Sequence, residues 1–184
     1  MAGVETLASR EVYANPWMTV REDVIRRPDG STGIYGVIDK PTYALVIPLD
    51  GDRLQLVEQF RYPLGMRRWE FPQGTAPERA RLDPAALAAR ELREETGLTA
   101  GRMVELGLID CAAGTSSQRG HAYLATDLTV GEPEREPEEQ DMRTGWFTRA
   151  EFEDMARRGE ITDAQSLAAY ALLLLHERRE DHAG

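Results

Sequence analysis

The sequence predicts an α/β sandwich in which helices cover a mixed β-sheet. Segments rich in β-forming residues recur along the chain and alternate with a few helical segments. Among them, Tyr43–Leu49 is a nearly continuous apolar run, which is typical of a strand buried on both faces. The 184 residues are enough for one main domain with a sizeable core. We expect this domain over residues 41–184, preceded by an antiparallel β extension over residues 1–40.

Four strands are predicted before the first helix. In chain order they are Trp17–Arg26, Ile34–Asp39, Tyr43–Leu49 and Arg53–Phe60. The turn signal Pro28-Asp29-Gly30 joins the first two into a hairpin, which could form a small separate sheet. Residues 61–81 contain several prolines and glycines, and we expect them to be irregular.

The clearest helix begins after Asp83, which can cap it, with Pro84 at its favoured first position. Gly97 supplies the stop. Later elements follow in order: strands at residues 102–109, 121–126 and 145–148, then helices at residues 151–158 and 163–178 separated by Gly159. Residues 131–140 form a connection rich in proline and glutamate.

Composition excludes several classes of protein. The net charge of −10 argues against binding to nucleic acid, which relies on basic patches. No apolar run approaches the roughly 20 residues that a membrane helix needs, and residues 1–10 do not resemble a signal peptide. A single cysteine, Cys111, permits no internal disulfide, which fits a cytoplasmic location.

Three glutamates crowd the end of the predicted helix. Glu91, Glu94 and Glu95 are neighbours at helical spacing. We expect them nearly opposite a narrow face formed by Ala85, Ala88, Ala89, Leu92 and Thr96. Their mutual repulsion and the helix dipole both oppose this arrangement. A magnesium ion, which prefers carboxylate oxygens and also binds phosphates, would offset the repulsion. The alternative is an exposed acidic helix end with local Arg–Glu pairs.

The residues from Arg90 to Leu98 read Arg-Glu-Leu-Arg-Glu-Glu-Thr-Gly-Leu, and this stretch resembles the second half of the Nudix box. The resemblance implies a Nudix-type α/β/α sandwich and a hydrolase that uses Mg²⁺ or Mn²⁺. It implies these roles: Glu91 and Glu95 as main metal ligands, Glu94 for a further ion or water, Arg90 as orienting residue, and the Gln73 carbonyl as a further ligand. The first half departs from the pattern, since Leu82 stands where a glutamate is usual and the interval from Gly74 to Arg90 is two residues longer.

Other segments resemble the ADP-ribose pyrophosphatase branch of this family. They are Gln59-Phe60-Arg61, Trp69-Glu70-Phe71-Pro72-Gln73-Gly74, the N-terminal hairpin, and Gly159–Asp163 before a last apolar helix. The resemblance implies a homodimer in which the N-terminal strands reach the partner's site. It also implies that Arg61 contacts the diphosphate or its ribose, the alternative being a surface arginine at the end of a strand. Trp17, Tyr35 and Trp69 could stack on a base, or simply pack in the core or at the dimer interface.

In that branch a carboxylate on the loop before the last strand collects the proton of the attacking water. Glu138 and Glu139 match this position, although a solvated acidic linker is the alternative. Gln118 stands where the branch often has a glutamate; it can hydrogen-bond a sugar or phosphate but cannot act as a base. The preferred substrate could therefore be a different nucleotide sugar.

Three functions remain open from the sequence. The first is hydrolysis of a nucleoside diphosphate sugar such as ADP-ribose to a nucleoside monophosphate and a sugar phosphate. The second is hydrolysis of dinucleoside polyphosphates or of an RNA 5′ end, and the acidic charge argues against the RNA version. The third is a ligand-sensing domain without turnover, which would not need a costly glutamate cluster.

Overall fold

A seven-stranded mixed sheet lies at the centre of the structure, a computed structural model that describes residues 3–76, 82–135 and 139–182. Its main path runs β10-β5-β4-β9-β8, with β6 paired to β5 and β7 paired to β4. Only β4 and β9 pair in parallel among these strands. The strands are β4 (Tyr43–Asp50), β5 (Arg53–Arg61), β6 (Met66–Glu70), β7 (Gln73–Thr75), β8 (Leu98–Asp110), β9 (Arg119–Val130) and β10 (Arg143–Thr148).

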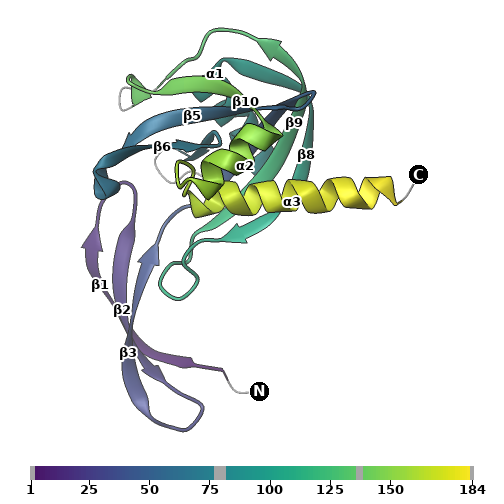
Figure 1. Ribbon diagram of the computed structural model, residues 1–184. Helices are drawn as coiled ribbons and strands as arrows, with labels where there is room; N and C mark the ends of the chain where they lie inside the picture. Colours follow the sequence, from purple (N-terminus) through teal and green to yellow (C-terminus); the bar gives the residue numbers. More distant parts are fainter. Residues whose placement is uncertain (1–2, 77–81, 136–138, 183–184) are drawn as a thin grey trace.

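Helices cover both faces of this sheet. On one face α1 (Pro84–Thr96) packs against the even-numbered residues of β4, which include Ala44 and Val46. On the other, α2 (Arg149–Arg157) and α3 (Ala164–Asp181) cover the odd-numbered ones, which include Leu45 and Ile47, and in Figure 1 α2 and α3 lie in front of the sheet. Successive residues of a strand point to opposite faces, so a strand between two helical layers must be apolar throughout. The predicted α/β/α sandwich is confirmed.

The N-terminal residues form a separate antiparallel sheet that projects away from the larger one (Figure 1). It contains β1 (Glu5–Ala14), β2 (Thr19–Arg26) and β3 (Thr32–Asp39) in that order. The expected hairpin corresponds to β2 and β3, but β1 was not expected. The sequence of β1 lacks the regular alternation of apolar and polar residues that would predict a strand. All of its residues are exposed in the structure, so none of them needed to be apolar. It exists because it pairs with β2 along its length.

The segment expected to be irregular contains two short strands. A 3₁₀ turn, η1 (Tyr62–Leu64), ends at Gly65 in the left-handed conformation with φ 64° and reverses the chain. As a result β6 returns antiparallel to β5, and β7 then pairs with β4. Glycines and prolines mark the turns correctly, but the pairing partners are distant in sequence.

Local signals place the ends of α1 correctly. The Asp83 side chain accepts a hydrogen bond from the Ala86 amide at 3.1 Å, and Gly97 closes the helix with φ 76°. The expected face is only partly correct, however. Ala88, Leu92 and Thr96 are buried, but Ala85 and Ala89 are exposed. Glu91 and Glu95, which were expected on the opposite side, are buried as well. On an ideal helix Glu95 lies close to Ala88, so both glutamates belong to the buried side of the helix rather than to its opposite.

The remaining elements are longer than expected at several ends. Strands β8 and β9 together form an extended antiparallel pair, and Gly159, with φ 76°, separates α2 from α3. Thr148 and Glu151 form a reciprocal capping box that starts α2. Among the described residues, no helix is both long enough and apolar enough to cross a membrane.

Candidate functional site

The first contact of the site joins Gln73 and Gly74 to the buried glutamates of α1. The Gln73 amide donates a hydrogen bond to Oε2 of Glu95 at 3.2 Å. Gly74 lies directly against Glu91, since a Cβ atom at this position would be 2.3 Å from Oε2 of Glu91. Glycine is therefore required here so that the backbone of β7 can approach the carboxylate.

Glu95 occupies a costly position. Its side chain is 1% exposed, and Oε1 has no hydrogen-bond partner among the described residues. Burial raises its pKa well above the usual value, and the charges of Glu139, Glu91 and Glu70 add to this effect, while the Gln73 amide opposes it. Such a carboxylate is stable as an anion only if a positive group joins it.

The other sequence-predicted acids are divided between two places. Glu94 is turned toward Arg90, whose Nε donates to both of its carboxylate oxygens at 2.8 and 2.9 Å. Glu139 lies close enough to Glu95 for its charge to raise the Glu95 pKa. Glu138 falls outside the described residues. Of the three glutamates expected to converge, Glu91 and Glu95 are buried together, whereas Glu94 forms an ion pair with Arg90.

Residues 131–134, which precede Glu139 in the chain, are hydrogen-bonded to the end of α1. The Gly131 amide donates to the Gly97 carbonyl at 2.8 Å, and the Glu134 amide donates to the Glu94 carbonyl at 3.0 Å. These bonds satisfy carbonyl groups that the last turn of a helix leaves without partners. They also bring this segment to the side of the helix end where Glu95 lies.

A cavity of about 490 Å³ opens next to the Gln73–Gly74 segment. Its polar and charged lining comes from several elements that are distant in sequence: Lys40, Arg61, Arg68, Glu70, Gln73, Thr75, Gln118, Thr162, Asp163 and Gln165. Apolar atoms come mainly from Tyr43, Pro63 and Leu64. Three cations in one cavity suit an anionic ligand, and the many polar groups suit a sugar.

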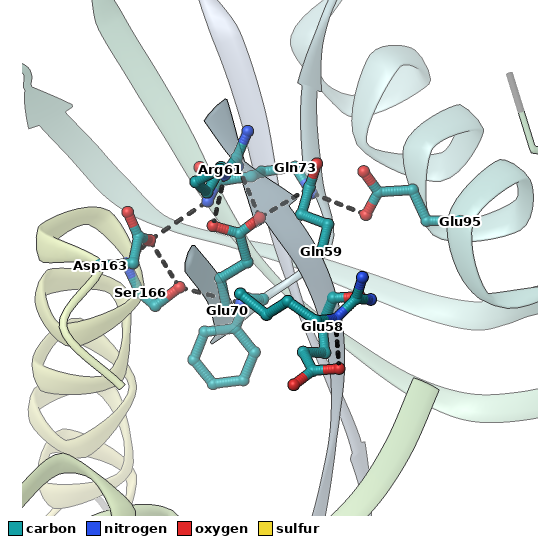
Figure 2. A network of polar contacts seen from close by, with 10 residues as sticks. Glu58, Gln59, Arg61, Glu70, Gln73, Glu95, Asp163 and Ser166 are labelled. Carbon is teal, nitrogen blue, oxygen red and sulfur yellow. Dashed lines mark hydrogen bonds and ion pairs between the residues drawn. The ribbon is translucent and has the colours of Figure 1, made fainter. Parts of the chain in front are cut away.

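Arg61 is fixed in this cavity by a buried carboxylate, as Figure 2 shows. Its Nε and one Nη donate to the two oxygens of Glu70 at 3.1 and 2.6 Å, and Gln59 donates to Glu70 at 2.6 Å. Glu70 is only 1% exposed. Burial raises its pKa to about 7, although the Arg61 charge and hydrogen bonds pull it down. The paired arginine side chain remains 38% exposed and can still contact a ligand.

A second set of hydrogen bonds links the start of α3 to the same segment (Figure 2). Asp163 accepts from the side-chain amide of Gln73 at 3.2 Å and from the Ser166 hydroxyl at 2.7 Å. The Ser166 hydroxyl in turn accepts from the Phe71 amide at 2.9 Å. Gln73 is therefore held on two sides, by Glu95 through its backbone and by Asp163 through its side chain.

The structure brings only some of the expected ligand-binding residues together. Arg61 and Gln118 line the cavity, and Gln118 donates to the Pro41 carbonyl at 3.1 Å. Trp17, Tyr35 and Trp69 do not line it. Trp17 is 67% exposed on the N-terminal extension, whereas Trp69 packs edge-on against Phe147 at 4.9 Å. The Tyr35 hydroxyl donates to the Gly114 carbonyl at 2.6 Å.

Sequence reasoning missed four charged residues that line this cavity: Lys40, Arg68, Glu70 and Asp163. Glu70 lies within a segment that was singled out, but nothing in the sequence shows that it is buried beneath Arg61. Asp163 had the one usable signal, because it precedes a helix and could be read as its cap.

The oxygen donors near Gln73 fit a hard divalent cation. Two buried carboxylates lie one helical turn apart, and one of their oxygens has no hydrogen-bond partner among the described residues. Within those same residues, no three acidic, histidine or cysteine side chains already form a complete metal site. The fitting donors are therefore Glu91 and Glu95, with the Gln73 carbonyl as the nearest backbone candidate.

Comparisons with known proteins agree with this description. Residues 39–170 match the family model of the NUDIX domain, and residues 4–38 match that of the nucleoside diphosphate sugar hydrolase N-terminal domain. The chain is 37% identical over 174 residues to an ADP-ribose pyrophosphatase of Mycobacterium tuberculosis, covering 94% of this chain and 83% of that protein. It is 26% identical over 175 residues to an ADP-ribose pyrophosphatase of Bacillus subtilis, covering 94% of each.

A solved structure shares the fold. The crystal structure of an ADP compounds hydrolase superposes with a TM-score of 0.82 at 20% sequence identity. The match covers 99% of this chain and 97% of the other, so it includes the N-terminal sheet as well as the sandwich.

Proposed function

Because this chain belongs to the Nudix family, we propose that it hydrolyses ADP-ribose to AMP and ribose 5-phosphate with Mg²⁺ as its cofactor. It is a Nudix hydrolase that acts on nucleotide sugars, and the choice of ADP-ribose rests on the names of two relatives. One observation supports the chemistry most directly. The Gln73–Gly74 segment is both a wall of the ligand cavity and the backbone that contacts Glu91 and Glu95.

The residues of the site would share the work as follows. Arg61, fixed by Glu70, would bind the diphosphate through charge-assisted hydrogen bonds. Glu91, Glu95 and the Gln73 carbonyl would hold Mg²⁺, or Mn²⁺ in its place. When bound, the cation would neutralise these carboxylates, polarise a phosphoryl oxygen and lower the pKa of the attacking water.

The proton of that water needs an acceptor on the protein. Among the described residues, Glu139 is our first choice for this acceptor. It lies outside α1, and its charge acts on Glu95. Glu94 would bind a further ion or position water, and Arg90 would orient it through their ion pair. Gln118, which also lines the cavity, would hydrogen-bond the sugar or phosphate.

The N-terminal extension, residues 1–40, would serve as a dimerisation element. Its exposed apolar side chains include Leu7, Val12, Trp17 and Ile34, which suits a sheet that is covered by a partner. Trp17 and Tyr35 could then reach the base in the partner's site. We place the protein in the cytoplasm, in keeping with its single cysteine.

The experiment is a turnover assay of the full chain with ADP-ribose and Mg²⁺. We expect equal amounts of AMP and ribose 5-phosphate, complete loss of activity in excess EDTA, and recovery when Mg²⁺ or Mn²⁺ is added back. A panel of other nucleoside diphosphate sugars and dinucleoside polyphosphates identifies the preferred base and sugar. Cleavage of none of these compounds would refute the enzyme proposal and favour a ligand sensor.

A matched pair of glycine variants tests the metal site. Gly74→Ala places a methyl group where the Glu91 carboxylate lies, so it should weaken Mn²⁺ binding and turnover together. Gly36→Ala on β3 has no atom within 4 Å of the added carbon and serves as the control. Normal Mn²⁺ affinity in Gly74→Ala would contradict the assignment of Glu91 as a ligand.

A further inference from the structure

Arg67, on β6, makes contacts on two sides close to the site. Toward the sheet, its Nε donates to the Glu58 carboxylate at 2.8 Å, and one Nη donates to the Glu58 carbonyl at 3.0 Å. Toward the loop before β10, it pairs with the Asp141 carboxylate and donates to the Asp141 carbonyl at 2.8 Å. Figure 2 shows Glu58 at the lower edge of the polar network. Because both partners are bound through two groups each, the planar guanidinium is fixed in orientation.

Glu58 is itself positioned by the sheet. It lies on β5, between β6 on one side and β10 on the other, and it is directly opposite Arg143 of β10. Its carboxylate is 17% exposed and approaches Arg143 at 3.7 Å. Arg67 therefore anchors Asp141, which lies outside any strand, to the sheet.

Asp141 belongs to a short turn that starts at Glu139. The Met142 amide donates to the Glu139 carbonyl at 2.9 Å, and the Met142 side chain is buried at 2% exposure. The turn is consequently held from inside by Met142 and from outside by Arg67. Hydrogen bonds connect this turn to the end of α1, since Gln140 donates to the Arg135 carbonyl at 3.2 Å and Arg135 donates to the Glu95 carbonyl at 3.5 Å. Glu139, the first residue of the turn, therefore lies near the glutamate cluster, and its charge acts on buried Glu95.

We propose that Arg67 is a positioning residue that holds Glu139 at the glutamate cluster by fixing Asp141. The inference rests on the proposed role of Glu139 as proton acceptor and adds the device that places it. Without the clamp, the turn would keep the buried Met142 and the hydrogen bond from Gln140 to Arg135 but would lose its link to the sheet. The Glu139 carboxylate would then sample positions away from the attacking water. Misplacement of about 1 Å at a reacting group costs up to about a hundredfold in rate.

Asp141→Ala is the central test, because Asp141 is 61% exposed and its loss should not unfold the protein. With ADP-ribose and saturating Mg²⁺, we expect kcat to fall about tenfold to a hundredfold while KM changes little. Hydrogen exchange should become faster at the Met142 amide, which is a readout independent of turnover. Arg67→Ala should reproduce both effects, and Arg67→Lys, which keeps the charge but not the planar fork, should restore only part of kcat.

The double variant Glu139→Gln/Asp141→Ala separates positioning from general structure. It should be no slower than Glu139→Gln alone, because the clamp acts through that carboxylate. Additive losses, or wild-type kcat in Asp141→Ala while Glu139→Gln is impaired, would overturn the inference and leave the hydrolase proposal standing. Wild-type kcat in Glu139→Gln would remove its premise. Asp50→Ala, which breaks a similarly exposed ion pair with Arg53 at the end of β4 opposite to the cavity residue Tyr43, is the matched control.

Discussion

The two sheets of this protein are built from the same kinds of strand but are covered very differently. In the seven-stranded sheet, Leu45 and Ile47 on β4 are completely buried between helical layers. In the N-terminal sheet, every residue of β1 is exposed, and only Asp23 and Ile25 are buried in the whole sheet. Both sheets contain long antiparallel strand pairs with register shifts, so pairing alone does not distinguish a core from an extension.

The difference shows where stability and association come from. Burial of apolar surface stabilises the seven-stranded sheet within one chain. The N-terminal sheet leaves large apolar side chains in water, so burying them requires contact with something outside the sheet. We therefore expect changes in the larger sheet to affect folding and catalysis, and changes in the smaller one to affect association.

The largest effect is expected at Glu95. Glu95→Gln should reduce turnover of ADP-ribose by roughly a thousandfold, since loss of a metal-binding charge removes several kcal/mol of transition-state stabilisation. The metal-free variant should be at least as stable as the wild type, because glutamine avoids the cost of burying this carboxylate or of protonating it. Steady-state kinetics and thermal melting in EDTA test both statements.

The control for this variant is Glu11→Gln on exposed β1, which should retain wild-type turnover. Activity within about threefold of wild type in Glu95→Gln would be incompatible with a ligand role.

A matched pair of isoleucines tests the comparison of the two sheets directly. Ile47→Ala removes a fully buried side chain from β4 and should lower the free energy of unfolding by about 2–5 kcal/mol. Ile34 on β3 is 68% exposed, and Ile34→Ala should leave the stability of the monomer almost unchanged. Denaturant titrations of both variants provide the measurement.

The same pair reports on association. Ile34→Ala should raise the dimer dissociation constant in sedimentation experiments, whereas Ile47→Ala should affect association only through folding. If Ile34→Ala had no effect on the oligomeric state, the N-terminal sheet would need another partner.

Glu70 should make the free energy of unfolding depend on pH. Its pKa is raised to about 7 in the folded protein, so between the unfolded value and that pH the folded state keeps a proton that the unfolded state has lost. The free energy of unfolding should therefore fall as pH rises through this window, by on the order of 3 kcal/mol from this group. Denaturant titrations of metal-free wild type and Glu70→Gln at pH 5 and pH 8 test it, because the variant should lack this contribution.

Asp23, the buried carboxyl of the N-terminal sheet, provides the contrast. A hydrogen bond from Ser9 and then the Arg21 contact hold its pKa below the usual value. Its contribution to stability is thus present above the ordinary pKa of an aspartate and is lost as pH falls.

An equal pH dependence in wild type and Glu70→Gln between pH 5 and pH 8 would contradict the assignment to Glu70.

The smallest effect is expected for the exposed ion pair between Arg10 and Glu22. These residues lie directly opposite each other on β1 and β2, at 3.2 Å, but the arginine side chain is 73% exposed. Solvent and salt screen such pairs, so Arg10→Ala should not measurably shift the denaturation midpoint. A clear loss of stability would show that Arg10 is covered in the assembled protein.

The sequence was sufficient for features that depend on neighbouring residues. The cap at Asp83 and the stop at Gly97 were predicted correctly, because capping uses only local atoms. The apolar run at Tyr43–Leu49 correctly indicated a strand covered on both sides. The spacing from Arg90 to Gly97 pointed to the Nudix family, which the family comparison confirms.

Features that depend on residues distant in the chain were not predicted from the sequence. Strands β1, β6 and β7 exist through pairing with other strands, and their own residues predict them weakly. The lining of the cavity combines Lys40, Arg61 and Asp163 from separate parts of the chain. The contact of Arg67 with Asp141 spans 74 positions.

By itself, then, the sequence determined where the glutamate helix begins and ends and which chemistry its spacing favours. Only the tertiary structure decided that Glu91 and Glu95 face inward, because the backbone of Gln73 and Gly74, brought by β7, packs against them. The physical reason is range. Caps and spacing act over one or two helical turns, whereas burial of a charge depends on which distant segments pack beside it.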